Sequence, residues 1–409
     1  MKQAFILIGI DDNPLPHFTE EIRACIRQAK TFSGGTRHYE IVRTMLPAGH
    51  EWINITVPLD NVFARYDQCF AKDSGPIVVF ASGDPLFFGF ANTLMRERSD
   101  AELRIFPFFN SLQLLAHRVP MRYDDMRIVS LTGRPWQGLD AALIERAAKI
   151  GVLTDRTHTP ATIAARLLEY GYTYYNMYIG EHLGNTQRER VSRLSLEAAA
   201  RTEFECPNCL ILQADAIPPR PFGLPDERFE HLDGRSRMIT KMPIRLLSLQ
   251  ALDLPLRHVL WDIGFCTGSV SIEARLQFPH LQVCSFEVRP ECGRLMHINS
   301  RRFGTPGIQT FIGDFMETDI SPIPVPDAVF IGGHGGKLQK MLRKIQQVLL
   351  PGGCVVFNSV SPDSRTMFEE GTREAGLQLC LPRHIALDDY NPITIMRAFY
   401  PVDNTNPIE

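Results

Sequence analysis

The stretch Trp261-Asp262-Ile263-Gly264-Phe265-Cys266-Thr267-Gly268-Ser269 decides how the second half of this chain folds. Residues 259–263 before the glycines are apolar apart from Asp262 and predict a buried strand, and residues 270–277 have the spacing of a helix. Glycines between a strand and a helix let the backbone approach a ligand closely, and the helix N-terminus offers free N–H groups. The stretch therefore predicts the first strand–loop–helix unit of a doubly wound, Rossmann-like α/β domain.

Two further polar sites follow at the ends of the next predicted strands. Glu287 ends the strand 282–287, where a carboxylate can accept both hydroxyls of a ribose. Gly313 and Asp314 end the strand 308–313, where the carboxylate and the ring that follows it can hold an adenine. Ligands of doubly wound sheets bind at the carboxyl ends of the strands, so these positions predict one nucleoside-binding site.

The spacing of the loop separates two nucleoside ligands. Dinucleotide-binding folds hold a pyrophosphate with G-x-G-x-x-G, whereas this loop reads Asp-x-Gly-x-Cys-x-Gly. Its leading acid would repel a pyrophosphate but can receive the cationic amino group of S-adenosylmethionine (SAM), directly or through water. A structural glycine turn without a ligand is the alternative. The pattern favours SAM, and the candidate cofactor-binding residues are Asp262, Gly264, Thr267, Gly268, Glu287, Gly313 and Asp314.

Length and composition are those of a globular protein with two cores. The 409 residues are 44% hydrophobic and 22% charged, and the formal net charge is −3. No run of Lys and Arg marks a nucleic-acid footprint. The first ten residues read as a strand and not as a signal peptide, and the apolar stretch 76–95 is broken by a Ser-Gly-Asp-Pro turn. We expect a cytoplasmic protein that binds neither nucleic acid nor a membrane.

The nine cysteines predict reduced thiols, because they are scattered and their number is odd. Cys206 and Cys209 form the one close pair. A structural zinc site needs a second pair, and none lies at suitable spacing. We expect no metal site.

The first half alternates strand-like and helix-like segments, which predicts a separate α/β domain. The segment 217–225 carries four prolines, which favour an extended spacer between the two domains. We predict a first domain at 1–215, a linker at 216–235, a second domain at 236–400 and a tail at 401–409.

Hydrophobic spacing predicts the remaining elements, with Thr240 as the cap of the helix that follows it. Helices are expected at 19–29, 88–98, 111–117, 141–148, 160–170, 243–252, 291–303, 337–349 and 364–375, and strands at 5–10, 77–81, 103–107, 127–130, 150–154, 176–179, 208–213, 328–332, 354–359, 378–381 and 393–398.

Residues 224–400 resemble the C-terminal half of the fused precorrin-6Y C-5,15-methyltransferases (decarboxylating). The resemblance rests on motifs that follow one another in the family's order, and family members usually have a glycine where this chain has Cys266. The motifs are Leu224-Pro-Asp-Glu-Arg-Phe-Glu-His231, Met238-Ile-Thr-Lys241, the Asp262 loop running into Thr267-Gly-Ser-Val-Ser-Ile-Glu273, and Phe330-Ile-Gly-Gly-His-Gly-Gly336.

The first half resembles the tetrapyrrole methylases. Its motifs, in the family's order, are the strand 5–10, Gly34-Gly-Thr-Arg-His38, Gly83-Asp-Pro85, Asn110-Ser111, Thr132-Gly-Arg-Pro135, Thr154-Asp155 and Gly180-Glu-His-Leu-Gly184. Two loops depart from the family: Ile10–Asn13 replaces a glycine-rich turn, and Pro107-Phe-Phe-Asn-Ser111 replaces Pro-Gly-Ile-Ser. Both departures concern the wall that faces the tetrapyrrole.

The resemblance implies a two-subdomain tetrapyrrole methylase followed by a class I methyltransferase, with one SAM in each domain. In the first domain it implies cofactor binding at Gly83, Asp84 and Pro85, and less directly at Ser111 and Thr132. The implied function belongs to cobalamin (vitamin B12) biosynthesis: methylation of a corrin-type tetrapyrrole at C-5 by the first domain, and at C-15 by the second, with loss of CO2 from the C-12 acetate. It also implies a homo-oligomer.

A tetrapyrrole substrate carries several carboxylates, which gives arginines in the cleft a function. The candidates in motif loops are Arg37, His38, Arg134 and Arg156, and ordinary solvated side chains are the alternative for each. His334 is a weak candidate for handling a proton, against a loop histidine without a catalytic role.

Two other functions stay open. In one, only the C-terminal domain is catalytic and the first domain is a scaffold that docks the substrate. In the other, the chain is a SAM-dependent methyltransferase of RNA or protein, because class I folds serve many substrates. The Gly83-Asp84-Pro85 turn speaks against the first, and the absence of a basic sequence run against the second.

Overall fold

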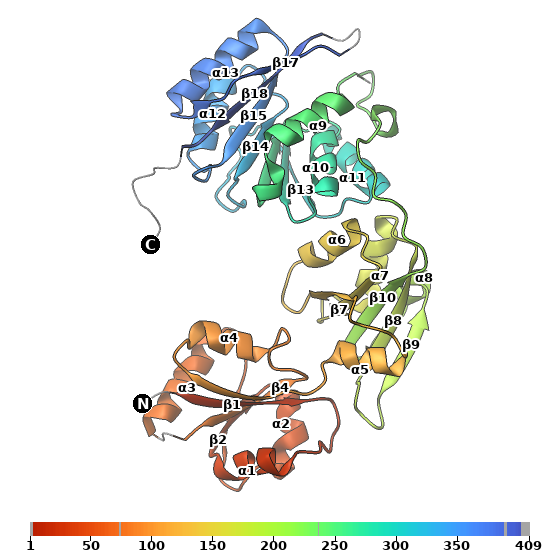
Figure 1. Cartoon of the computed structure of the whole chain (residues 1–409), viewed down its shortest axis with the longest axis vertical. Helices are drawn as coiled ribbons and strands as arrows, with labels where there is room; N and C mark the ends of the chain where they lie inside the picture. The colour runs from red at the N-terminus through yellow and green to blue at the C-terminus, as the bar shows by residue number, and fades with distance from the viewer. Residues whose placement is uncertain (1–2, 73–74, 236, 388–390, 402–409) are drawn as a thin grey trace. The chain divides into compact units, whose positions relative to one another are not determined.

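The computed structural model describes residues 3–72, 75–235, 237–387 and 391–401 (Figure 1). The chain forms two compact units. The first unit runs up to Arg134 and takes in Ala148–Ala165 and Tyr174–Ala216. The second contains Pro135–Ala147, Arg166–Thr173 and the chain from Ile217 onward. The first unit holds two five-stranded sheets and the second holds one eight-stranded sheet.

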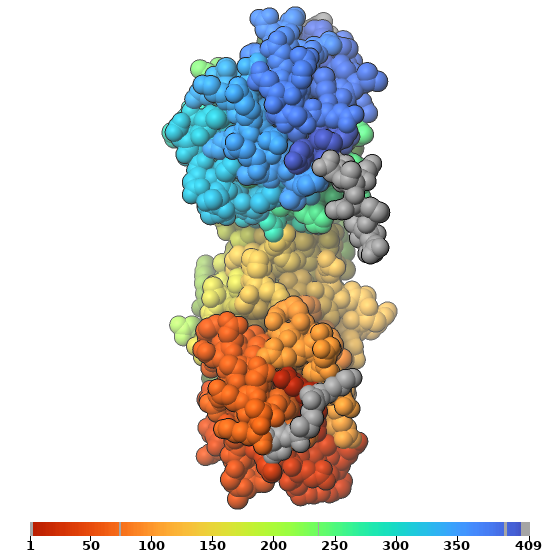
Figure 2. All heavy atoms as spheres, turned by 90° about the vertical axis from the view of Figure 1, so that its left-hand side faces the viewer, coloured from red at the N-terminus to blue at the C-terminus, as the bar shows by residue number. Residues whose placement is uncertain are grey.

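The first sheet is parallel throughout, with strands in the order β3-β2-β4-β1-β5. Successive residues of β1 point to opposite faces. Phe5 and Leu7 pack with residues of α3 and α4, and Ile6 and Ile8 with residues of α1 and α2. In the space-filling view the darkest red atoms show only through a small opening among orange ones (Figure 2). The strands are β1 (Ala4–Ile10), β2 (Thr31–Gly34), β3 (Glu51–Asn54), β4 (Ile77–Ser82) and β5 (Glu102–Phe106).

The second sheet is mixed, in the order β6-β7-β10-β8-β9. Strands β6 and β7 are parallel, and β10 runs antiparallel to both of its neighbours. Buried residues of α5 pack against β10. The strands are β6 (Arg127–Ser130), β7 (Lys149–Leu153), β8 (Tyr175–Glu181), β9 (Arg190–Leu194) and β10 (Asn208–Ala214).

The third sheet has the order β13-β12-β11-β14-β15-β18-β16, with β17 paired to β18. The first five strands are parallel. The chain adds β12 and β13 on one side of β11 and then β14 and β15 on the other, so the strand order reverses between β11 and β14. Such a switch point opens a crevice at the carboxyl ends of the strands. The strands are β11 (Val259–Ile263), β12 (Gln282–Glu287), β13 (Ile308–Ile312), β14 (Ala328–Ile331), β15 (Cys354–Ser359), β16 (Gln378–Leu379), β17 (Arg383–Ile385) and β18 (Ile393–Phe399).

Helices cover both faces of the third sheet, as doubly wound architecture requires. Buried residues of α12 and α13 pack on one face, and those of α9 and α10 on the other. The helices of the chain are α1 (Glu20–Gln28), α2 (Thr36–Val42), α3 (Asp60–Lys72), α4 (Phe90–Glu97), α5 (Ser111–Arg118), α6 (Gln137–Ile144), α7 (Pro160–Glu169), α8 (Leu196–Ala199), α9 (Met242–Ala251), α10 (Ser269–Gln277), α11 (Glu291–Phe303), α12 (Leu338–Gln346) and α13 (Pro362–Glu374).

Two local predictions were wrong. The helix expected at 141–148 spans Gln137–Ile144, because Arg146 adopts a left-handed backbone conformation (φ +58°) that ends it. Thr240 does not cap α9; Lys241 occupies that position without a side-chain cap, and the Thr240 carbonyl accepts a hydrogen bond from Arg245 instead. Helix α3 was not predicted, and neither were the short elements β2, α2, β3, β9, α8 and β17.

The proline-rich segment is anchored in the second unit from Gly223 onward. The backbone N–H groups of Gly223 and Leu224 donate to the Glu273 carboxylate at 3.0 and 2.9 Å, and Leu224 is fully buried. Arg245, also fully buried, contacts the same carboxylate at 3.3 Å and Asp226 at 3.1 Å. This buried ion-pair cluster holds the segment that leads to Met238–Lys241.

Among the residues that the structure describes, no helix has both the length and the apolar character needed to cross a membrane.

Candidate functional site

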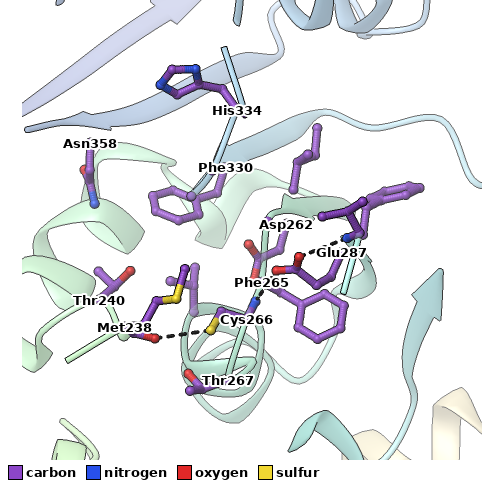
Figure 3. Close-up of a pocket in the computed structure, with 18 of the residues that line it drawn as sticks. Met238, Thr240, Asp262, Phe265, Cys266, Thr267, Glu287, Phe330, His334 and Asn358 are labelled. Atoms are coloured by element: carbon purple, nitrogen blue, oxygen red, sulfur yellow. Dashed lines mark hydrogen bonds between the residues drawn. The ribbon is translucent and has the colours of Figure 1, made fainter. Parts of the chain in front are cut away.

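A cavity of about 570 Å³ opens at the carboxyl ends of β11, β12 and β14 in the second unit (Figure 3). This is the edge of the sheet at which the strand order reverses. Every cofactor-binding residue predicted for this domain lines the cavity except Gly268. The lining members are Asp262, Gly264, Thr267, Glu287, Gly313 and Asp314.

Asp262 is the buried acid of the cavity. Its Oδ2 accepts hydrogen bonds from the backbone N–H and the hydroxyl of Ser271, and Ser271 in turn contacts Ser285 at 2.8 Å. Its Oδ1 is buried without a hydrogen-bond partner. Burial raises the pKa of Asp262 to about 7. The carboxyl group is thus held by one oxygen and offers the other to a donor in the cavity.

Thr267 supplies a second polar atom of the same kind. Its side chain is 1% exposed, and its Oγ1 has no hydrogen-bond partner among the described residues. A buried polar atom left without a partner costs about 1–3 kcal/mol. A ligand that brings an ammonium and other polar groups to this wall relieves that cost, so the wall fits the methionine end of SAM.

The loop after β11 requires glycine at two positions with left-handed backbone conformation. Gly264 has φ +84°, and a Cβ there would lie 2.6 Å from the backbone nitrogen of Gly333. Gly268 has φ +76°, and a Cβ there would lie 2.5 Å from the Met296 sulfur. The two loops that frame the cavity can meet this closely only without side chains.

Glu287 closes the cavity at the end of β12. Its Oε2 accepts the Cys266 N–H at 3.0 Å, and its Oε1 accepts the N–H groups of Val288 at 2.9 Å and Arg289 at 3.2 Å. The Arg289 guanidinium also donates to Oε1, at 3.1 Å, so that oxygen is fully occupied, whereas Oε2 keeps a lone pair that can accept a ribose hydroxyl. The backbone of Cys266 adopts a left-handed conformation, with φ +47°, and its thiol donates to the Met238 carbonyl at 3.3 Å (Figure 3).

Asp314 and His334 form the outer part of the wall. Asp314 pairs with Lys337 at 2.5 Å, and this hydrogen bond lowers the pKa of Asp314. His334 Nδ1 accepts the N–H of Gly336 at 3.1 Å, and partial burial lowers the pKa of the ring. His334 therefore stays neutral near pH 7, with its proton on Nε2. It lies apart from Cys266 and Thr267 in Figure 3.

Several residues that line this cavity were not among the predicted site residues. They are Arg237, Met238, Thr240, Lys241, Asn358 and Val360. The motif Met238-Ile-Thr-Lys241, which precedes α9, was the available signal. It lies far from the glycine loop in sequence, so nothing in the sequence alone placed it at the same cavity. Asn358 gave no signal: it is the last residue but one of β15 and reaches the cavity because β15 lies beside β14.

A second cavity, of about 820 Å³, lies in the first unit. Three chain segments meet beside it at the ends of β1, β4 and β5. The Gly83 N–H donates to the Ile10 carbonyl at 2.7 Å, and the Phe108 N–H donates to the Gly83 carbonyl at 3.3 Å. A Cβ on Gly9 would lie 1.9 Å from the Gly83 oxygen, so glycine is the only residue that this junction admits.

The predicted cofactor-binding residues of the first domain divide into two groups. Gly83, Ser111 and Thr132 line the cavity. Asp84 and Pro85 are not among the lining residues, and Asp84 instead accepts the Leu86 N–H at 2.8 Å and so shapes the turn.

Arg37 and His38 lie in the cavity wall, where they contact other protein groups. Arg37 donates to the buried Asp12 and to the Ser82 hydroxyl, each at 2.6 Å. His38 Nδ1 accepts the Gly35 N–H at 3.1 Å, and its Nε2 contacts Ser82 at 2.9 Å. Burial, together with the charge of Arg37, lowers the pKa of His38 to about 3, so the ring is neutral.

The structure separates the other two substrate candidates. Arg134 lines the cavity, and its Nη1 donates to the Ser130 hydroxyl at 2.8 Å and to the Thr132 carbonyl at 3.2 Å. Arg156 is exposed and is not among the lining residues, although the half-buried Thr154 two residues before it is.

Two family models match the chain, one in each half. The model described as Tetrapyrrole (Corrin/Porphyrin) Methylases matches residues 5–200, and the one described as Precorrin methyltransferase domain matches residues 227–406. A precorrin-6Y C(5,15)-methyltransferase (decarboxylating) from Sinorhizobium is 32% identical over 87% of this chain and 84% of its own length. This chain belongs to that family.

The precorrin methyltransferase match covers the whole lining of the cavity in the second unit, and the tetrapyrrole methylase match covers the lining of the other cavity except Pro207, Asn208 and Cys209. The tetrapyrrole methylase match includes Gly83, Ser111 and Thr132, and the precorrin methyltransferase match includes Asp262 and Glu287.

Other relatives carry the name of one methylation. The cobalt-precorrin-6B C(15)-methyltransferase (decarboxylating) of Salmonella typhimurium is 40% identical over 33% of this chain and 68% of its own length. The cobalt-precorrin-7 C(5)-methyltransferase of the same organism is 31% identical over 46% of this chain and 88% of its own length.

Proposed function

We propose that this chain is a SAM-dependent bifunctional methyltransferase of cobalamin biosynthesis. It methylates a precorrin-type tetrapyrrole at C-5 in the first domain and at C-15 in the second, with release of CO2 from the C-12 acetate. The observation that carries this proposal is the presence of two separate cavities, each lined mainly by residues of one of the two methylase matches. Each domain would hold its own SAM.

In the second domain the residues present fit SAM at both of its ends. Asp262 Oδ1 and Thr267 Oγ1 are unpartnered and would receive the methionine end, while Glu287 would accept a ribose hydroxyl and Asp314 would lie at the adenine. When bound, SAM supplies an electrophilic methyl group that needs no further activation. The chain contributes orientation and the exclusion of water.

In the first domain the backbone around Gly83 would bind the cofactor, and Ser111 and Thr132 would flank it. Arg134 is the substrate-binding candidate with free donors, because among the described residues only its Nη1 donates hydrogen bonds to the protein. Arg37 already neutralises Asp12, so it would shape the wall instead of pairing with the substrate.

Decarboxylation fits a mechanism in which the macrocycle accepts the electron pair. The bond between the C-12 acetate methylene and its carboxyl carbon breaks, CO2 leaves, and the pair enters the conjugated imine system. A proton then returns to the methylene. His334 is neutral, which makes it a weak donor at neutral pH, and it stays only a weak candidate for this step.

The test is product analysis with the full chain. It is incubated with methyl-13C SAM and precorrin-6Y, with and without cobalt, and the products are examined by mass spectrometry and 13C NMR. We expect two labelled methyl groups and loss of CO2 from the unaltered chain. Asp262→Asn should lose the C-15 methyl group, and Gly83→Val the C-5 methyl group.

Three results would contradict the proposal in different ways. A single methyl group, at C-15, would leave the first domain as a docking scaffold. Binding of one SAM per chain in calorimetry would do the same. No reaction with any tetrapyrrole would return the chain to the methyltransferases of RNA or protein.

A further inference from the structure

Phe88 is a strained residue in the wall of the first cavity. Its φ is +55°, in the left-handed region where a bulky side chain is an outlier. Its side chain is 44% exposed, so the fold does not bury the ring in return for the strain. Strained residues of this kind concentrate at ligand-binding sites.

A second exposed aromatic ring lines the same cavity. Phe109 is 50% exposed and belongs to the loop Pro107–Ser111, which departs from the tetrapyrrole methylases. Edge-to-face contacts hold both rings: Phe87 against Phe88 at 5.3 Å, and His117 against Phe109 at 5.4 Å. Exposed apolar groups gathered at a cavity mark a binding surface.

The positively charged side chain of Arg134 lies over the Phe88 ring. The Arg134 guanidinium lies 5.4 Å from the ring centre, and Arg134 Nη1 is tied to Ser130 and Thr132. No described residue contacts its Nε or Nη2 through a hydrogen bond or ion pair. The planar guanidinium therefore offers a fork of N–H donors to an anion at the edge of the aromatic surface.

The size of the cavity leaves room for more than a nucleoside. It measures about 820 Å³, against about 570 Å³ for the cavity of the second domain. The backbone junction at Gly83 and the rings of Phe88 and Phe109 are distinct parts of its wall. The first suits hydrogen bonding to a cofactor, and the second suits the face of a conjugated ligand.

We propose that Phe88 and Phe109 hold the face of the tetrapyrrole in the C-5 methylation site, while Arg134 pairs with one of its peripheral carboxylates. This assignment rests on the proposed function. A conjugated macrocycle stacks on aromatic rings, and its carboxylates form charge-assisted hydrogen bonds with arginine. The strain at Phe88 turns its ring toward the ligand.

The decisive variant is Phe88→Asn in the full chain. Asparagine tolerates the left-handed conformation, so it removes the ring without adding backbone strain. We expect the KM for the tetrapyrrole in C-5 methylation to rise about tenfold, which corresponds to the loss of about 1.4 kcal/mol of aromatic contact. The Kd for SAM should stay within twofold, and the melting temperature should not fall.

Arg134→Gln tests the charged contact. It should raise the same KM by a similar factor and weaken its dependence on salt, because the ion pair with the carboxylate is lost. Phe222→Asn is the matched control: Phe222 is 73% exposed and lines neither cavity, so its kinetics should equal those of the unaltered chain.

An unchanged KM in Phe88→Asn would overturn the assignment. So would a Kd for SAM that weakens in step with the KM, because the ring would then belong to the cofactor pocket. Failure of the proposed function looks different: the unaltered chain itself would place no methyl group on C-5.

Discussion

Replacing Gly264 by alanine is the sharpest test of the glycine loop in the second domain. Two costs add at this position. The left-handed conformation, φ +84°, costs an alanine about 1–2 kcal/mol. The new Cβ would also lie 2.6 Å from the Gly333 nitrogen and 2.9 Å from its Cα, and overpacking against backbone costs about 1–3 kcal/mol.

The expected loss of unfolding free energy for Gly264→Ala is therefore about 2–5 kcal/mol. Gly376→Ala is the matched control. Gly376 has φ +67° in the same unit, with nothing within 4 Å of its Cβ position, and it lies outside the cavity. It should lose only the strain cost of about 1–2 kcal/mol.

Hydrogen exchange of β11 peptides in increasing urea reads the unfolding free energy of this unit alone. Calorimetry gives the affinity for SAM. Gly264→Ala should be the less stable variant by about 1–3 kcal/mol and should bind SAM more weakly, because Gly333 must move and its loop frames the cavity. Equal stability of the two variants would refute the close approach of the loops.

Three other predictions concern buried groups of the second domain. Burial raises the pKa of Asp262 from 3.8 to about 7. Asp262 therefore contributes up to about 4 kcal/mol to the free energy of unfolding below pH 4, and this contribution is lost as the pH rises to 7. Urea titration across this range should show that loss, and Asp262→Asn should remove it. SAM affinity should change in the opposite sense, strengthening as pH rises through 7 while Asp262 ionises; a flat profile would contradict this role. Arg245→Met should destabilise the unit by about 3–5 kcal/mol, because it leaves Glu273 buried without its cation, and Arg245→Lys should recover part of the loss in urea unfolding. Cys266→Gly should raise the free energy of unfolding by roughly 1 kcal/mol, because glycine relieves the backbone strain. Cys266→Ala keeps the strain and loses the thiol contact, so it should be less stable than the unaltered chain. A Cys266→Gly variant less stable than Cys266→Ala would contradict this account of the strain.

Much of the fold was predictable because its signals are local. The strands 259–263, 282–287 and 354–359 and the helix 291–303 were predicted with the observed bounds, since apolar runs and helical spacing lie within each segment. The short strands β2 and β3 escaped because four residues carry little periodicity. Helix α6 was misplaced because its end depends on the backbone conformation of a single residue, Arg146.

The sequence by itself determined that a glycine loop and an acid follow the first strand of the second domain, and that Glu287 ends the next one. These facts depend on residue order, which also places both at the carboxyl edge of a parallel sheet. Tertiary structure decided which oxygen of Asp262 stays unpartnered, because that depends on Ser271 and on burial. It likewise decided that Arg134 lines a cavity and Arg156 does not. Both belong to motif loops, and the sequence does not show which of these loops borders the cavity, because the cavity is lined by segments distant in sequence, such as Phe88 beside Arg134.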